Sequence, residues 1–197
     1  FFFKQKTAYE ISTRDWSSDV CSSDLNRFGA VSPTTAKAVE EEIGERLSET
    51  DQILDGGPCL VGVESTIIDC TGEAPRILRP GAITEEMVES STRLQLRERD
   101  DLIRVSGALE KHYSPDAKIF IDGDVEVGDG FLALADIPTP DGVIRLASPN
   151  SIEEFARILY QSLRDADAKG LTRVKVINPL GPGLAAAIRD RVARASR

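Results

Sequence analysis

Residues 55–69 have the sequence Asp-Gly-Gly-Pro-Cys-Leu-Val-Gly-Val-Glu-Ser-Thr-Ile-Ile-Asp, and this segment sets the fold class of the first part of the chain. It joins a glycine-rich turn, Asp55 to Pro58, to short runs of β-branched residues. Such runs favour strands, whereas Gly and Pro favour the turns between them. Together with its neighbours, the segment predicts part of a mixed sheet with strands at residues 52–54, 60–63, 66–70 and 76–78.

Upstream of this segment, apolar residues recur at helical spacing after Ser32-Pro33. Serine is a common N-cap and proline is common in the first turn of a helix. We therefore predict an amphipathic helix that begins at Ser32-Pro33 and presents free backbone amides, which can bind phosphate oxygens. On spacing alone, the simpler interpretation is that Ser32 and Thr34 only cap the helix.

Downstream, the pattern predicts a short helix at residues 85–89, a connector at 99–116, and a second unit from Ala117 onward. Strands alternate there with two helices, which is typical of a small open α/β sheet of the Rossmann-like kind. Ser151 and Glu154 form a predicted capping box at the start of the first helix, and Gly170 can end it. The predicted strands cover residues 118–121, 131–135, 143–147 and 174–177, and the second helix covers residues 184–195.

The composition limits the classes of function. The chain has 197 residues with a formal net charge of -9, whereas proteins that bind a polyanion usually carry a basic patch. We therefore do not expect direct tRNA binding. No apolar run approaches the roughly 20 residues that a membrane helix needs. Three cysteines without CxxC spacing and a single histidine indicate neither a zinc site nor a disulfide framework, so we expect a cytoplasmic protein with reduced thiols.

Residues 1–25 differ sharply from the rest of the chain. They include Lys-Gln-Lys-Thr-Ala-Tyr-Glu-Ile at 4–11 and Asp-Trp-Ser-Ser-Asp-Val-Cys-Ser-Ser-Asp-Leu at 15–25. Both stretches resemble translated sequencing adapters, in one frame and in the expected order. We interpret residues 1–25 as an artefact and expect the natural sequence to begin in mid-gene; the alternative is a disordered natural tail. The expected division is 1–25, a partial domain at 26–98, a linker at 99–116 and a C-terminal domain at 117–197.

Four motifs carry a resemblance to a known family. Residues 26–35 resemble the end of S-x-N-x-x-G-x-x-S-P-T, and residues 55–69 resemble D-G-G-x-x-x-x-G-x-x-S-T-[IV]-[IV]-D. Residues 77–83 match I-L-R-P-G-x-I, and residues 112–115 match H-Y-[AS]-P. In this order the motifs resemble those of the two-domain threonylcarbamoyl-AMP synthases, which join a YrdC-like domain to a C-terminal domain. Ala108-Leu109 depart from the family's commonest linker.

The resemblance implies two sets of binding residues. Ser65 would contact threonine, and the residues that would contact ATP are Asn26, Ser32, Arg79 and Tyr113. The residue chemistry agrees, because a short hydroxyl can hydrogen-bond a small polar ligand and the planar guanidinium fork matches phosphate oxygens. Taken alone, Ser65 would more simply be structural and Arg79 a surface ion pair.

Three further features admit simpler interpretations. Glu64 could equally be a solvated charge. His112 could be a general base but is better explained as a positional residue. The sequence at residues 181–183, Gly-Pro-Gly, lacks a phosphate-loop pattern and indicates a turn.

The family resemblance implies an L-threonylcarbamoyladenylate synthase, a nucleotidyltransferase of tRNA modification. Its substrates would be L-threonine, bicarbonate or CO2, and ATP with Mg²⁺, and its product would pass to a threonylcarbamoyl transferase complex. Most basic residues of the family pocket lie in its first half, so we expect this chain to be inactive alone. The alternatives are an RNA-binding or regulatory module without catalysis, and a carbamoyltransferase of hydrogenase maturation.

Overall fold

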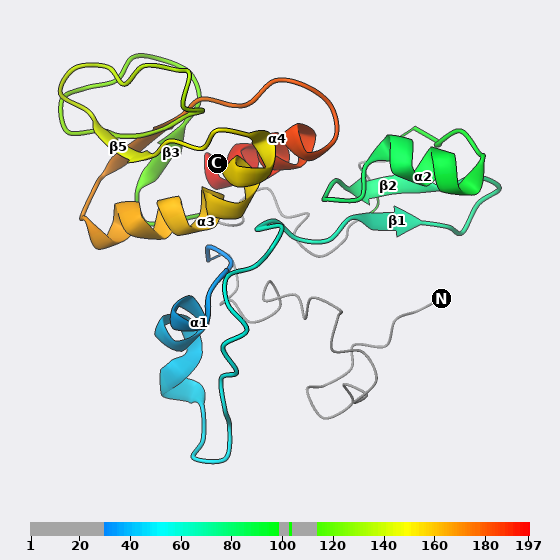
Figure 1. The fold of residues 1–197 in the computed structure, drawn as a ribbon, viewed down its shortest axis with the longest axis horizontal. Coiled ribbons are helices and arrows are strands. Elements are labelled where there is room, and N and C mark those ends of the chain that lie inside the picture. Colours follow the sequence, from blue (N-terminus) through cyan, green and yellow to red (C-terminus); the bar gives the residue numbers. More distant parts are fainter. Residues whose placement is uncertain (1–29, 99–102, 104–113) are drawn as a thin grey trace.

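The computed structural model describes residues 30–98, 103 and 114–197. Residues 30–98 form what we call the N-terminal unit, and residues 114–197 form the C-terminal unit (Figure 1). The N-terminal unit contains α1 (Ala36–Ile43), a 3-10 turn (Gly44–Arg46), β1 (Ile67–Asp69), β2 (Arg76–Arg79) and α2 (Glu85–Thr92). The C-terminal unit contains β3 (Lys118–Phe120), β4 (Gly130–Leu132), β5 (Ile144–Ala147), α3 (Ile152–Ala168), β6 (Arg173–Val176) and α4 (Leu184–Ala195).

Helix α1 begins later than the sequence predicts. Thr35 is its N-cap and accepts a hydrogen bond of 3.1 Å from the backbone amide of Ala38. The predicted start at Ser32-Pro33 is therefore wrong. The helical conformation is disfavoured for the residue before a proline, which is Ser32 here. The carbonyl of Thr34 is also paired outside the helix, because it accepts a hydrogen bond of 2.9 Å from the amide of Cys59.

Strands β1 and β2 pair in antiparallel fashion, with Ile67 opposite Arg79 and an irregularity after Ile67. They confirm two of the four predicted strands in this region. The other two, at residues 52–54 and 60–63, are wrong, because both segments are irregular in the structure. Segment 60–63 lies against helix α3 instead, so its backbone groups face a helix rather than another strand.

The four strands of the C-terminal unit form one parallel sheet in the order β3-β6-β4-β5. This confirms the predicted small open α/β sheet, and α4 has the predicted bounds. Helices α3 and α4 pack against each other and against one face of the sheet. The buried core between them includes Ile119, Leu132, Leu159, Val174 and Ile188.

The other face of this sheet is covered by cations stacked on aromatic rings. The guanidinium of Arg145 lies 5.2 Å from the centre of the Phe131 ring, and that of Arg173 lies 4.9 Å from the centre of the Phe120 ring. Lys175 donates to the carbonyls of Ile121 and Gly123 at 2.9 and 2.8 Å. Such contacts cover apolar rings and satisfy loop carbonyls together.

The end signals of α3 are mostly as predicted. Ser151 accepts from the amide of Glu154 at 3.2 Å, and Gly170 follows the helix with a φ of 67°. The predicted capping box is only half formed, because the Glu154 carboxylate accepts from the amide of Asn150 at 2.7 Å rather than from that of Ser151. No helix in the described residues is both long and apolar enough to cross a membrane.

The two units pack closely along α3. The last part of the segment between α1 and β1 comes up to the helices of the C-terminal unit (Figure 1), and Gly62 lies directly against the backbone of α3. A Cβ on Gly62 would stand 2.3 Å from the Cα of Arg157 and 2.4 Å from the carbonyl oxygen of Ala156. The Arg157 guanidinium donates to the carbonyl of Leu60 at 3.2 Å. Only glycine leaves room for this contact, which explains one glycine of the 55–69 motif.

Candidate functional site

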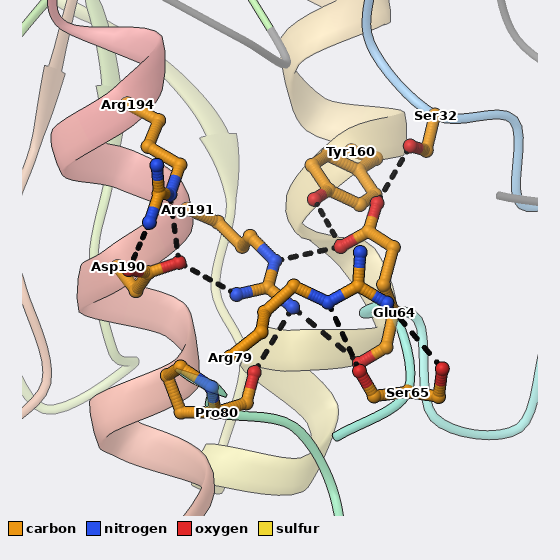
Figure 2. A network of polar contacts seen from close by, with 9 residues as sticks. All are labelled: Ser32, Glu64, Ser65, Arg79, Pro80, Tyr160, Asp190, Arg191 and Arg194. Atoms are coloured by element: carbon orange, nitrogen blue, oxygen red, sulfur yellow. Dashed lines mark hydrogen bonds and ion pairs between the residues drawn. The ribbon is translucent and has the colours of Figure 1, made fainter. Parts of the chain in front are cut away.

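Three of the five predicted site residues come together around one buried carboxylate. Ser32 bonds the Glu64 carboxylate, Ser65 follows Glu64 in the chain, and Arg79 bonds Ser65, as Figure 2 shows. The other two, Asn26 and Tyr113, lie outside the described residues, as does His112. Their predicted roles stay predictions.

Arg79 and Ser65 form a direct pair. The Nε of Arg79 donates to the carbonyl of Ser65 at 3.1 Å, and its Nη2 donates to the Ser65 hydroxyl at 3.4 Å. Arg79 is the last residue of β2 and is only 8% exposed, so the surface ion pair considered for it is wrong. Ser65 itself is exposed. The pair therefore presents a hydroxyl at the surface with a guanidinium directly behind it.

Gly81 lets the segment that carries Ser65 approach the end of β2, which carries Arg79. A Cβ on Gly81 would stand 2.5 Å from the amide nitrogen of Thr66 and 2.6 Å from the carbonyl oxygen of Glu64. Real Cβ contacts are not this short, so a side chain at residue 81 would push the Ser65 segment away. This is the physical reason for glycine in the Arg-Pro-Gly motif.

The side chain of Ser32 is hydrogen-bonded to Glu64. Its hydroxyl donates to Oε1 of Glu64 at 2.6 Å, and the residue is 2% exposed. A serine hydroxyl has one proton to donate. In this structure that proton goes to the carboxylate, so a phosphate contact through the hydroxyl would require Ser32 to turn.

Glu64 is the centre of the site. Besides Ser32, its carboxylate accepts from the Tyr160 hydroxyl at 2.8 Å and from Nε of Arg191 at 2.6 Å. The residue is 2% exposed, so its interpretation as a solvated charge is wrong. Burial acts to raise the pKa of Glu64, but the charge of Arg191 and the hydrogen bonds from Ser32, Arg191 and Tyr160 outweigh it and hold the pKa below its usual value.

Arg191 ties helix α4 to the segment that leads into β1 and to the residue that follows β2. Its side chain is fully buried, and Nη2 donates to the carbonyls of Pro80 and Glu64 at 3.0 and 3.4 Å. Nη1 donates to Asp190 at 2.7 Å, and Asp190 in turn accepts two bonds of 3.0 Å from Arg194. Burial works to raise the pKa of Asp190, yet the hydrogen bonds and charges of Arg194 and Arg191 lower it below its usual range.

Sequence reasoning missed four members of this network, namely Tyr160, Asp190, Arg191 and Arg194. Tyr160 and Arg191 lie 96 and 127 residues from Glu64 along the chain, so no local spacing connects them. A run of charges on a helix usually faces solvent, which gives no reason to bury Arg191. The available signal was helical spacing, because Arg191 lies three residues after Ile188 and four before Ala195, on the buried face of α4.

The arrangement can bind a small polar or anionic ligand. The Ser65 hydroxyl can donate to or accept from such a ligand, and the Arg79 guanidinium behind it suits carboxylate or phosphate oxygens. Gly183 is the N-cap of α4 with a φ of 63°, as expected for the turn at residues 181–183. Within the described part of the chain, no group of three or more His, Cys, Asp or Glu gathers as metal ligands, and neither Cys59 nor Cys70 forms a disulfide.

Two family models match the chain. The model described as the threonylcarbamoyl-AMP synthase C-terminal domain matches residues 83–197, more than half of the chain. A second, described as telomere recombination, matches residues 4–81. That match includes most of the stretch interpreted as adapter-derived, and this interpretation stays a prediction.

Individual relatives agree with the family models. The chain is 27% identical to the threonylcarbamoyl-AMP synthase of Pyrococcus abyssi over 90% of its own length and 57% of the relative's. It is 33% identical to the Bacillus subtilis threonylcarbamoyl-AMP synthase over 52% of its own length and 30% of the relative's.

One solved structure extends the likeness to the fold. The match to the crystal structure of P. abyssi Sua5 complexed with L-threonine covers 87% of this chain and 56% of the Sua5 chain. The TM-score is 0.70 and the sequence identity is 28%. The chain thus spans little more than half of the Pyrococcus relative. The family models, the relatives and the fold agree, and the chain belongs to the two-domain threonylcarbamoyl-AMP synthase family.

Proposed function

We propose that the chain forms part of an L-threonylcarbamoyladenylate synthase, a cytoplasmic nucleotidyltransferase. It would make threonylcarbamoyl-AMP and pyrophosphate from L-threonine, bicarbonate or CO2, and ATP, for the threonylcarbamoyladenosine modification of tRNA. The observation that carries the proposal is the pairing of exposed Ser65 with buried Arg79, at 3.4 Å between hydroxyl and guanidinium. The structure of the P. abyssi relative with L-threonine supports threonine as the amino-acid substrate.

Each site residue has a proposed role that suits its chemistry. The Ser65 hydroxyl would hydrogen-bond threonine, and the Arg79 guanidinium would face the phosphates of ATP. Asn26, Ser32 and Tyr113 would contact the nucleotide, with Ser32 doing so through its backbone or after its hydroxyl leaves Glu64. Threonine at Ser65 and phosphate at Arg79 would then lie next to each other, because the two side chains are 3.4 Å apart.

The proposed reaction forms one bond to phosphorus and breaks another. The threonine amine attacks CO2 and loses a proton, giving a carbamate. A carbamate oxygen then attacks the α-phosphorus of ATP, and the bond from that phosphorus to the bridging oxygen breaks as pyrophosphate leaves with the electron pair. A fixed cation such as Arg79 stabilises the charge that develops on the phosphate oxygens, and holding the reactants together supplies proximity.

Mg²⁺ would accompany ATP in this proposal. Glu64 and Asp190, the carboxylates of the site, both face arginines, and the described residues contain no cluster of metal ligands. These residues do not fit a protein-held metal. The chemistry proposed for the chain therefore rests on its arginine and hydroxyl groups, and the downstream transferase complex is proposed from the family alone.

The activity can be tested by measuring threonine-dependent release of pyrophosphate from ATP and bicarbonate. The 197-residue chain should release none above background. The chain extended by its own upstream coding sequence should be active. Activity of the 197-residue chain would show that the catalytic groups lie within it. Inactivity of a folded extended protein would refute the proposed function.

The two residue roles can be separated by substitution in the extended protein. Arg79→Ala removes a charge-assisted contact of roughly 1.5–3 kcal/mol. The value of kcat/KM for ATP should therefore fall about tenfold to a hundredfold. Arg79→Lys should recover only part of that loss, because an ammonium lacks the planar fork. Ser65→Ala should raise KM for threonine and leave ATP affinity without threonine unchanged. The reverse pattern would show that the roles are misassigned.

A further inference from the structure

The backbone that carries Ser65 is held by a residue from the other unit. Glu64, directly before Ser65, receives Nε of Arg191 at 2.6 Å on its carboxylate and Nη2 at 3.4 Å on its carbonyl. Arg191 lies on α4 of the C-terminal unit. The side chains of both residues are at most 2% exposed. Water is therefore a poor substitute for either partner.

The same side chain also reaches the strand that carries Arg79. Nη2 of Arg191 donates to the carbonyl of Pro80 at 3.0 Å, and Pro80 directly follows Arg79. One guanidinium thus bonds the neighbour of each member of the Ser65 and Arg79 pair, as Figure 2 shows. Because Gly81 lies close against the backbone of residues 64–66, a small shift of either segment would change the distance between Ser65 and Arg79.

Arg191 is itself fixed in orientation. Asp190 accepts from its Nη1 at 2.7 Å and is held by two bonds of 3.0 Å from Arg194, all on α4. Tyr160 of α3 donates to the same Glu64 oxygen that receives Nε of Arg191. The planar fork of arginine keeps several such bonds in one geometry, which a lysine ammonium cannot do.

We infer that Arg191 is a positioning residue: from the C-terminal unit it holds Ser65 and Arg79 at the spacing the ligand site needs. A buried ion pair often adds no net stability over apolar packing, so we assign this one a role through the geometry that it imposes on the two segments. The C-terminal unit is then a structural part of the ligand site. The effect on substrate rests on the proposed function, whereas the ordering of the two strands does not.

The first arm of the test uses the 197-residue chain and needs no activity. Hydrogen exchange would be measured for peptides covering residues 63–69 and 77–82 in Arg191→Met, Arg191→Lys and the unchanged chain. The matched control is Val192→Ala, which removes buried volume from the next residue of α4 without touching Glu64 or Pro80. We expect exchange at least tenfold faster in both peptides for Arg191→Met, with Arg191→Lys intermediate and Val192→Ala near the unchanged chain. Equal effects of Arg191→Met and Val192→Ala would overturn the inference.

The second arm uses the extended protein, well below the unfolding midpoint of every variant. Arg191→Met should raise KM for threonine at least tenfold, and Arg191→Lys should raise it by less. Val192→Ala should leave KM for threonine unchanged. An unchanged threonine KM in an otherwise active Arg191→Met protein would overturn the positioning role. If the extended unchanged protein is inactive, the proposed function fails, and the exchange arm still decides whether Arg191 orders the two strands.

Discussion

The C-terminal unit has its own core, whereas the N-terminal unit buries its charges against helices of the other unit. The main hydrophobic cluster belongs to the C-terminal unit, apart from Val31. Val63 of the N-terminal unit is partly buried and packs against this cluster. The N-terminal unit has a two-stranded sheet and short helices, and its buried polar residues include Ser32, Glu64 and Arg79. Because polar groups cost free energy when buried without partners, the order of the N-terminal unit should depend on α3 and α4.

Breaking the buried ion pair between Glu64 and Arg191 should cause the largest loss in the free energy of unfolding. Glu64→Leu leaves Arg191 buried without its carboxylate, so the free energy of unfolding should fall by about 3–5 kcal/mol. Urea unfolding of the 197-residue chain would measure it. Glu41→Leu is the control, because Glu41 pairs with Lys37 on the surface at 3.6 Å and should change stability little. Similar losses in the two variants would contradict the claimed dependence.

Gly62→Ala should have the next largest effect. The added Cβ would collide with the backbone of α3, and the φ of 83° is unfavourable for alanine. Together these effects should cost about 2–4 kcal/mol of unfolding free energy. Gly123→Ala is a matched control, with a φ of 85° and no atom within 4 Å of the added Cβ. If both variants lose the same stability, the close approach to α3 does not matter.

The interface should also make stability depend on acid pH. The pKa of Glu64 is lowered in the folded state, so its contribution is present above its unfolded value near 4.5 and is lost as pH falls through the folded value. The charged group that faces it is Arg191 on α4, and the hydroxyls of Ser32 and of Tyr160 on α3 donate to it. Below pH 4.5 the unchanged chain should therefore lose unfolding free energy more steeply than Glu64→Gln. Parallel curves for the two proteins would rule out Glu64 as the titrating group.

Removal of residues 1–25 should have the smallest effect. These residues show no periodicity that would bury one face, so the thermal unfolding midpoint should not change. The family match that begins at residue 4 gives the opposite expectation. Thermal unfolding of the shortened chain decides between them, because a drop of several degrees would correspond to about 1 kcal/mol of lost stability.

The parts of the fold that the sequence predicted are those with strong local signals. Helix α4 has the expected bounds, α3 has its Ser151 cap and Gly170 stop, and all four strands of the parallel sheet are present, although β4 ends at Leu132 rather than at residue 135. The start of α1 was missed because Ser32-Pro33 and Thr35 are competing cap signals, and only the tertiary contact of Ser32 with Glu64 decides between them. Segment 60–63 has strand composition, but its neighbour in space is α3.

The candidate site was predicted only in part, for the same reason. The motifs located Ser32, Ser65 and Arg79, which the structure brings together. They left Glu64 undecided, since its burial follows from Tyr160 and Arg191. A single sequence carries no signal that pairs residues so far apart.

The distance along the chain between Glu64 and Arg191 also affects how the protein folds during synthesis. The two residues are 127 positions apart, and ribosomes add roughly 5–20 residues per second. The Glu64 carboxylate is therefore made on the order of ten seconds before its cationic partner. The segment from Gly62 to Gly81 has no helix α3 to pack against for most of that time, and it has no Arg191 until the end of it. The N-terminal unit should consequently reach its final form only after the C-terminal unit has been synthesised, and it is the part most exposed to chaperones and proteases until then.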